Sequence, residues 1–328
     1  PAGEESAARQ MRAAAAQALG ALGARDAVPA LFELLRENAD ADVFLRHAAV
    51  FALARIGDLE AVWSRAADRD PAVRMGALLV LRRARDARLA HFLADPEPRL
   101  AVEAARAIHD LRIEKALPAL AALAGEAELA IESDDPETSY ALHRRSIDAN
   151  LMLGRAEDAD RLGRYARSAA HPLAMREAAL VALEEFAAPG PREPVNGYFR
   201  AIPPRDAALL APVLDTHLPE LLRGELAAAA FRVALRYERV PLADGELAVN
   251  AGRFWRGVEV RVASLRALAR RAAPGRIGPV LEAALRAALR SFSPALRAEA
   301  RDALVRLDPG LGAHACRGLA RHADDTVL

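Results

Sequence analysis

Residues 70–81, with the sequence Asp-Pro-Ala-Val-Arg-Met-Gly-Ala-Leu-Leu-Val-Leu, decide the fold of this chain. Asp70 is a residue type that caps helices, and Pro71 suits the first helical position. Arg74 is followed three, six and seven positions later by small or apolar residues, namely Ala77, Val80 and Leu81. This spacing places them on one helical face. The stretch therefore predicts a helix that begins near Asp70 and packs closely against a neighbour.

The same pattern recurs along the chain. Comparable series start at Arg12, Arg46, Arg144, Arg176, Arg261 and Arg297, with weaker copies at Arg99 and near Gly224. A second helix type alternates with the first and has proline in its first turn, as in Val28-Pro29-Ala30-Leu31, Leu117-Pro118-Ala119-Leu120, Leu218-Pro219-Glu220-Leu221 and Gly278-Pro279-Val280-Leu281. Two alternating helix types are typical of an α-solenoid. We therefore predict an all-α, right-handed solenoid of about nine helix pairs over residues 1–328, without a β-sheet.

The predicted helix starts carry capping and charge signals. Asp70-Pro71, Asp95-Pro96 and Ser293-Pro294 each place a capping side chain before a proline. Asp42, Asp70 and Asp95 each precede an arginine of the series by four residues. We expect these acids and arginines to pair with each other or with the next repeat.

Composition limits the classes of function. Of the 328 residues, 80 are alanine, which favours helix, and the 53% hydrophobic content argues against disorder. The 45 basic and 45 acidic side chains give a net charge of zero. This balance argues against nucleic-acid binding through bulk positive charge. We therefore expect protein partners and no nucleic acid.

Cysteine content and hydropathy exclude several further features. Cys316 is the single cysteine, so an intramolecular disulfide, a cysteine-pair zinc site and a C-x-x-C-H haem motif are all excluded. No uncharged apolar run reaches about 18 residues, so we expect no membrane span. The start of the chain lacks the basic and apolar regions of a signal peptide. Because the chain begins with Pro1, we expect a processed form or a fragment.

Two segments interrupt the repeats. The acidic loop at about residues 132–139 could bind a hard cation, but it lacks a spaced calcium-loop pattern, and a solvated loop is the alternative. The stretch at about 187–206 holds five prolines and two glycines, which exclude a helix. Within it, Tyr198, Phe199 and Arg200 form a candidate partner-binding cluster, since aromatics and arginine dominate interface hot spots. The alternative is that both aromatics cover the groove between two repeats.

Other candidate residues are isolated. Trp255 is either a partner anchor or a plug between repeats. Asn150 stands where sister repeats have alanine or valine, and we expect it to bond backbone carbonyls of a neighbouring helix, with a ligand contact as the alternative. The histidines form no metal-binding pair, and we expect them at the surface or at helix ends. His314 and Cys316 lack a third catalytic partner. The sequence thus indicates no catalytic, cofactor-binding or metal-ligating residue.

The x-P-x-L helix starts and segments such as Asp70-Pro71-Ala72-Val73-Arg74 resemble the HEAT-repeat family over nearly the whole chain. A narrower resemblance rests on Asp95-Pro96-Glu97-Pro98-Arg99-Leu100, Arg144-Arg145-Ser146-Ile147-Asp148-Ala149-Asn150 and the insertion ending in Pro203-Pro204-Arg205-Asp206. These segments are similar to the helical middle of the large haem-binding, membrane-bound dehydrogenase-like proteins of planctomycetes.

The narrower resemblance implies a place in a larger redox protein. In that family a sugar-dehydrogenase-like β-propeller precedes the HEAT array, and a c-type cytochrome domain with C-x-x-C-H follows it. The family is taken to be exported, which would place this chain in the periplasm or outside the cell. Haem c would belong to the parent protein, so no cofactor is expected in this chain.

Three functions are compatible with the sequence. The first is a non-catalytic scaffold, the spacer between a propeller dehydrogenase and a cytochrome domain, with the other parts of a redox assembly as partners. The second is a HEAT-like DNA glycosylase, which would use a basic groove and a tryptophan. The third is a HEAT-like bilin lyase, but the sequence has no cysteine or histidine cluster that supports this function. The interspersed acids, such as Glu177 and Glu184, favour the first.

Overall fold

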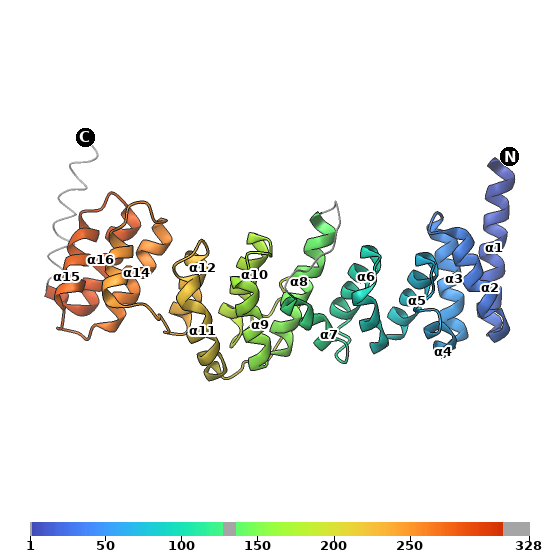
Figure 1. Ribbon diagram of the computed structural model, residues 1–328, viewed down its shortest axis with the longest axis horizontal. Coiled ribbons are helices and arrows are strands. Elements are labelled where there is room, and N and C mark those ends of the chain that lie inside the picture. Colours follow the sequence, from blue (N-terminus) through green and yellow to red (C-terminus); the bar gives the residue numbers. More distant parts are fainter. Residues whose placement is uncertain (1, 127–135, 311–328) are drawn as a thin grey trace. The chain divides into compact units, whose positions relative to one another are not determined.

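The computed structural model describes residues 2–126 and 136–310, and these ranges are helical throughout most of their length (Figure 1). The α-helices are α1 (Ala2–Leu22), α2 (Val28–Asn38), α3 (Val43–Ile56), α4 (Leu59–Trp63), α5 (Pro71–Ala84), α6 (Pro98–Asp110), α7 (Leu117–Ala122), α8 (Pro136–Leu153), α9 (Ala156–Arg167), α10 (Leu173–Glu185), α11 (Ala211–Leu221), α12 (Ala227–Arg236), α13 (Asp244–Gly252), α14 (Val258–Arg271), α15 (Pro279–Leu289) and α16 (Pro294–Leu307). Short 3-10 helices are η1 (Arg25–Ala27), η2 (Ala87–Ala94), η3 (Leu123–Gly125) and η4 (Ala207–Leu210). Across these ranges no strand occurs, and an isolated bridge joins Arg192 to Phe199. The prediction of an all-α solenoid without a sheet is confirmed.

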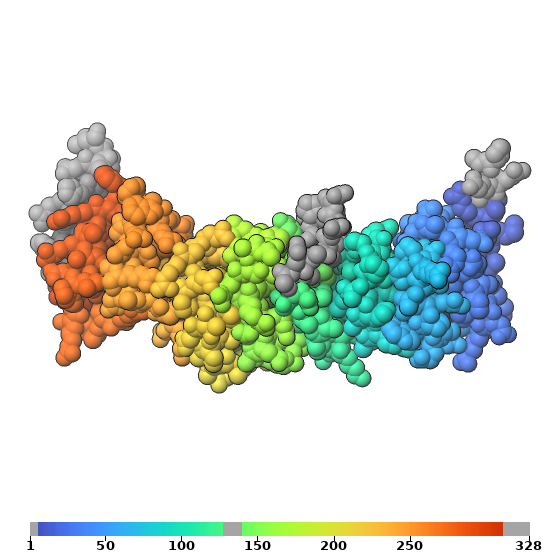
Figure 2. Space-filling model, viewed as in Figure 1, coloured from blue at the N-terminus to red at the C-terminus, as the bar shows by residue number. Residues whose placement is uncertain are grey.

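The chain divides into two compact units. The first comprises Pro1–Arg161 and Gly190–Ile202, and the second comprises Leu162–Pro189 and Pro203–Leu328. In the first unit, α1, α3, α5, α6 and α8 form one row in which each helix contacts the next. Helices α2 and α7, with η2, pack against that row. These are the two alternating helix types that the sequence predicts, and their residues succeed one another in chain order (Figure 2).

The second unit repeats this arrangement. Helices α10, α12, α14 and α16 contact one another in succession, and α11, α13 and α15 pack beside them. Each repeat therefore buries its apolar face against its sequence neighbours, as expected for stacked helical repeats.

Small side chains let the helices of a row approach closely. The positions three, six and seven residues after Arg46, Arg74, Arg176 and Arg297 are buried, including Ala49, Ala52, Leu53, Ala77, Val80, Leu81, Ala179, Leu183, Ala300 and Ala303. At Gly20 of α1 a Cβ would lie only 2.6 Å from the Cα of Ala52 in α3. The alanines are thus needed for packing as well as for helix propensity.

The predicted helix caps form at most of the expected positions. The carboxylate of Asp70 accepts from the backbone N–H groups of Ala72 and Val73 at the start of α5. Asp42 caps α3 in the same manner, and the hydroxyl of Ser293 caps α16. These side chains satisfy helical N–H groups that have no intrahelical acceptor.

Two predicted helix starts are wrong. Helix α6 begins at Pro98 and not at Pro96, because the Asp95 carboxylate accepts from the Glu97 N–H in the preceding turn. Leu218-Pro219 does not start a helix, since Pro219 lies in the last turn of α11 and Pro212 occupies its start. Pro219 cannot donate the backbone hydrogen bond to the carbonyl four residues before it, and α11 ends two residues later, at Leu221.

Arginine–carboxylate pairs link successive repeats, as predicted. Arg74 of α5 donates twice to Asp95, with both distances at 2.8 Å, and Arg36 of α2 donates twice to Asp68 at 3.1 Å. The Arg74 pair is largely shielded from solvent, so it contributes more to stability than an exposed pair would.

The structure describes one of the two predicted interruptions of the repeat in full. Residues 187–206 contain no helix, as predicted. Of the predicted acidic loop, residues 132–135 lie outside the described residues, and α8 begins at Pro136. His314 and Cys316 also lie outside them.

None of the helices in the described part of the chain has both the length and the hydropathy needed to cross a membrane.

Candidate functional site

The proline-rich insertion folds onto the first unit. Its Arg200 guanidinium donates to the backbone carbonyls of His109, at 3.2 Å, and of Asp110, at the end of α6. The neighbouring aromatics, Tyr198 and Phe199, remain 55% and 74% exposed. Arg200 holds the insertion in place, and its guanidinium still lies 5.2 Å from the centre of the Tyr198 ring. Most of the surface of both aromatic side chains is exposed, which does not fit the alternative that they cover a groove between two repeats.

Trp255 lies on the surface of the second unit, between α13 and α14. It is 67% exposed and its neighbour Phe254 is 81% exposed, with the rings edge to face at 5.0 Å. The guanidinium of Arg253 lies 5.6 Å from the Trp255 ring. The alternative of a core plug is wrong, because the stacked helices close their own core without this side chain.

Asn150 of α8 is fully buried. Its amide NH2 donates to the carbonyls of Ala121 in α7, at 2.9 Å, and of Ser146, at 2.7 Å. Its oxygen accepts from Arg161. The expectation that Asn150 bonds a carbonyl of a neighbouring helix is confirmed, and burial leaves no surface through which it could contact a partner.

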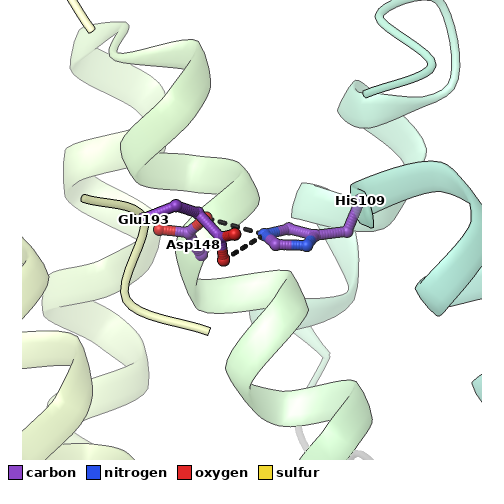
Figure 3. A group of neighbouring side chains, drawn as sticks. All are labelled: His109, Asp148 and Glu193. Carbon is purple, nitrogen blue, oxygen red and sulfur yellow. Dashed lines mark hydrogen bonds and ion pairs between the residues drawn. The ribbon is translucent and has the colours of Figure 1, made fainter. Parts of the chain in front are cut away.

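A buried polar cluster, which sequence reasoning missed, joins α6, α8 and the insertion. It consists of His109, Asp148 and Glu193, whose side chains converge in Figure 3. The Nε2 atom of His109 lies 2.7 Å from Oδ2 of Asp148 and 3.4 Å from Oε1 of Glu193. All three residues are buried, and one potential metal-ligating atom from each lies within 4.8 Å of the others.

Asp110 orients the histidine from the opposite side. Its Oδ1 lies 2.9 Å from Nδ1 of His109, and it also accepts from Arg145 and Asn196. Burial acts to raise the pKa of Asp110, but the hydrogen bonds from His109, Arg145 and Asn196 outweigh it and hold the pKa well below its ordinary value. Asp110 is therefore ionised and acts as an acceptor.

The electrostatics of His109 follow from its neighbours. Burial acts to lower its pKa, yet the hydrogen bonds to Asp110 and Asp148 and the negative charges of Asp148 and Glu193 raise it above its ordinary value. The site thus attracts positive charge at Nε2, either as a proton or as a metal ion.

The carboxylate of Glu193 is fixed by its own loop. Its Oε1 accepts from the backbone N–H groups of Val195, at 2.9 Å, and Asn196, at 3.1 Å. Its second oxygen, Oε2, and Oδ1 of Asp148 are buried without a hydrogen-bond partner. Such atoms are costly, so the cluster is either strained or completed by a ligand.

The repeat itself carries the signal that could have revealed the cluster. Asp148 is four residues after Arg144, where other repeats place Val50, Leu78 or Leu180. An acid at a core position of a solenoid needs a buried partner. The partner could not be identified from the sequence, since His109 lies 39 residues away.

The prediction that the histidines lie at the surface or at helix ends is wrong for His143 and His217, which are buried inside α8 and α11. His109, in the last turn of α6, and His171, two residues before α10, lie at helix ends as expected, but both are buried. His171, for example, stacks on Tyr165 with ring centroids 4.0 Å apart. In an alanine-rich array, the small side chains leave space between helices that these planar rings fill.

Fold and comparison agree on the class of protein, an all-α helical solenoid. The profile of the HEAT repeats family matches residues 4–82. That range runs from α1 to most of α5. No curated protein matches the chain.

Proposed function

We propose that this chain is a non-catalytic scaffold that binds other proteins, and that it serves as the helical spacer of a larger redox protein. The exposed Phe254–Trp255 pair carries the scaffold proposal. Tryptophan and arginine are the side chains that most often dominate protein–protein interfaces, and Arg253 lies beside the Trp255 ring. HEAT repeats, which match the first part of the chain, suggest the same role.

The distribution of charge supports protein partners over nucleic acid. In the second unit, Arg223 donates to both oxygens of Glu246, and Arg239 donates to both oxygens of Asp215. Arg271 bonds Asp244. Arginines neutralised in this way are not available to displace counterions from phosphates, the step that drives nucleic-acid binding.

The redox setting rests on the pattern of residues 95–206, which is similar to the helical middle of haem-binding dehydrogenase-like proteins. Its test is the genomic reading frame on both sides of this chain. We expect a β-propeller before it and a C-x-x-C-H segment after it. A frame that lacks both would overturn the redox part and leave the scaffold proposal standing.

The scaffold proposal is tested by binding. The domains encoded beside this chain are expressed separately, and their affinity for it is measured by calorimetry. Trp255→Ala should weaken binding about tenfold or more, as expected for an interface hot spot. Phe292→Ala is the matched control, because Phe292 is fully exposed on the same unit. Equal affinity of the wild type and Trp255→Ala would contradict the assignment of this surface.

A further inference from the structure

We propose that His109, Asp148 and Glu193 bind a divalent transition-metal ion. The three side chains offer one nitrogen and two carboxylate groups from three separate segments, α6, α8 and the insertion (Figure 3). Imidazole suits zinc, iron and nickel, and carboxylates accept all of these as well as manganese. Three protein ligands of this kind are a common donor set for such ions.

The hydrogen bonds around His109 leave the correct nitrogen for a metal. A carboxylate can only accept, so the contact between Asp110 and Nδ1 requires the proton to be on Nδ1. Nε2 faces Asp148 and Glu193, and without a metal it donates its proton to Asp148. A metal ion would displace that proton and coordinate the Nε2 lone pair. A carboxylate on the far nitrogen of a ligating histidine fixes the ring and raises its basicity. Arg145 and Asn196 hold that carboxylate in turn.

The two unpartnered oxygens are the second, independent observation. Asp148 and Glu193 are 3% and 4% exposed, yet Oδ1 of Asp148 and Oε2 of Glu193 have no hydrogen-bond partner. A proton on Nε2 would supply a single N–H, which cannot satisfy both carboxylates. A divalent cation would neutralise both carboxylate charges and would be coordinated by these oxygens. It would therefore remove the free-energy penalty of burying them unpaired.

The metal would have a structural role. Glu193 is the ligand from the insertion, and its Oε1 is already held by the N–H groups of Val195 and Asn196. Coordination through Oε2 would join this loop to α6 and α8 at a buried point. Metal binding should therefore stabilise the first unit and restrain the insertion, because a ligand that binds only the folded form raises its stability.

The experiment uses the full, untagged chain, stripped with chelator and then given Zn²⁺ or Mn²⁺. After removal of excess metal, elemental analysis should find about one Zn²⁺ per wild-type chain, and X-ray absorption should show nitrogen and oxygen ligands at about 2.0–2.2 Å. Glu193→Gln keeps the shape of the side chain and its Oε1 acceptor but should abolish stoichiometric binding. Glu259→Gln, an exposed acid of the second unit, is the matched control and should bind as the wild type does.

A second readout follows the loop itself. Arg192 is exposed and is followed by Glu193, so trypsin can cleave between them. Zn²⁺ should slow this cleavage in the wild type and in Glu259→Gln but not in Glu193→Gln. Asp110→Asn should lower the Zn²⁺ affinity by about 10- to 100-fold, as expected for a residue that orients a ligand.

Two results would overturn the proposal. One is a folded wild-type chain that retains neither metal and shows no protection of Arg192. The other is a Glu193→Gln variant that binds Zn²⁺ as tightly as the wild type. Circular dichroism of each variant establishes that it is folded, and Asp148→Asn replaces Glu193→Gln if the latter is not.

Discussion

Replacement of Asn150 by alanine should destabilise the first unit strongly. A polar residue on the surface of a repeat could be replaced with little effect, but Asn150 is fully buried. The substitution removes two donated hydrogen bonds, to Ala121 and Ser146, and one accepted from Arg161. A net hydrogen bond contributes about 0.5–1.5 kcal/mol, so three give about 1.5–4.5 kcal/mol. Because Arg161 keeps its bond to Asp158, we expect a loss of about 3 kcal/mol, near the middle of that range.

The assay isolates the unit that contains Asn150. The chain has two tryptophans, Trp63 in the first unit and Trp255 in the second. In a Trp255→Phe background, the fluorescence of Trp63, which contacts His91 edge to face at 5.3 Å, reports unfolding of the first unit alone. Urea titrations should give a lower midpoint for Asn150→Ala with an unchanged slope.

A matched control and a refuting result complete the test. Gln17→Ala removes an exposed amide from α1 of the same unit and should change stability by less than about 0.5 kcal/mol. A loss below about 1 kcal/mol for Asn150→Ala would refute the reasoning, because it would mean that the buried amide is not a structural bond to α7.

Three further predictions concern packing, a tyrosine anchor and pH. Gly20→Ala should lower the melting temperature, because a steric cost of about 1–3 kcal/mol against the backbone of Ala52 exceeds the gain in helix propensity of about 1 kcal/mol. Gly245→Ala, where the new Cβ would meet open space, should not lower it. Equal melting temperatures of the wild type and Gly20→Ala would contradict this. Tyr237→Phe removes a hydroxyl that bonds the carbonyls of Leu183 and Glu184 and the N–H of Ala187, and should cost about 1–3 kcal/mol by denaturant unfolding, whereas a neutral effect would show that water replaces it. Burial and the charge of Arg176 lower the pKa of His171 below its ordinary value of 6.5, so the unfolded chain binds the proton more tightly than the folded chain does. The free energy of unfolding should therefore fall as the pH drops below about 6.5, and it should fall less in His171→Gln. An identical pH dependence of the two proteins would refute this.

The candidate site shows how far sequence reasoning extends. The prolines of residues 187–206 predict a segment without a helix, and the structure has none there. That Arg200 would turn inward to the carbonyls at the end of α6 was not predictable, because its partners are 90 and 91 residues away. The same holds for Glu193, which meets His109 only after the chain has folded back.

The sequence by itself determined the helices, their alternation and most of their caps. These depend on residues three to seven positions apart, such as Asp70, Arg74 and Ala77, and local spacing fixes which of them share a face. The zero net charge also follows from the sequence, because it depends on composition alone. The structure shows that oppositely charged residues such as Arg74 and Asp95 pair between adjacent repeats.

Only the tertiary structure decided which polar groups meet. Asn150 could be recognised as unusual, but its bond to Ala121 depends on how closely α7 approaches α8. The cluster of His109, Asp148 and Glu193 combines segments that no periodic pattern relates. In a repeat array each helix is specified by its neighbours, whereas an insertion is positioned by the polar groups it finds on the surface of the stack, and those contacts form only when the stack itself has formed.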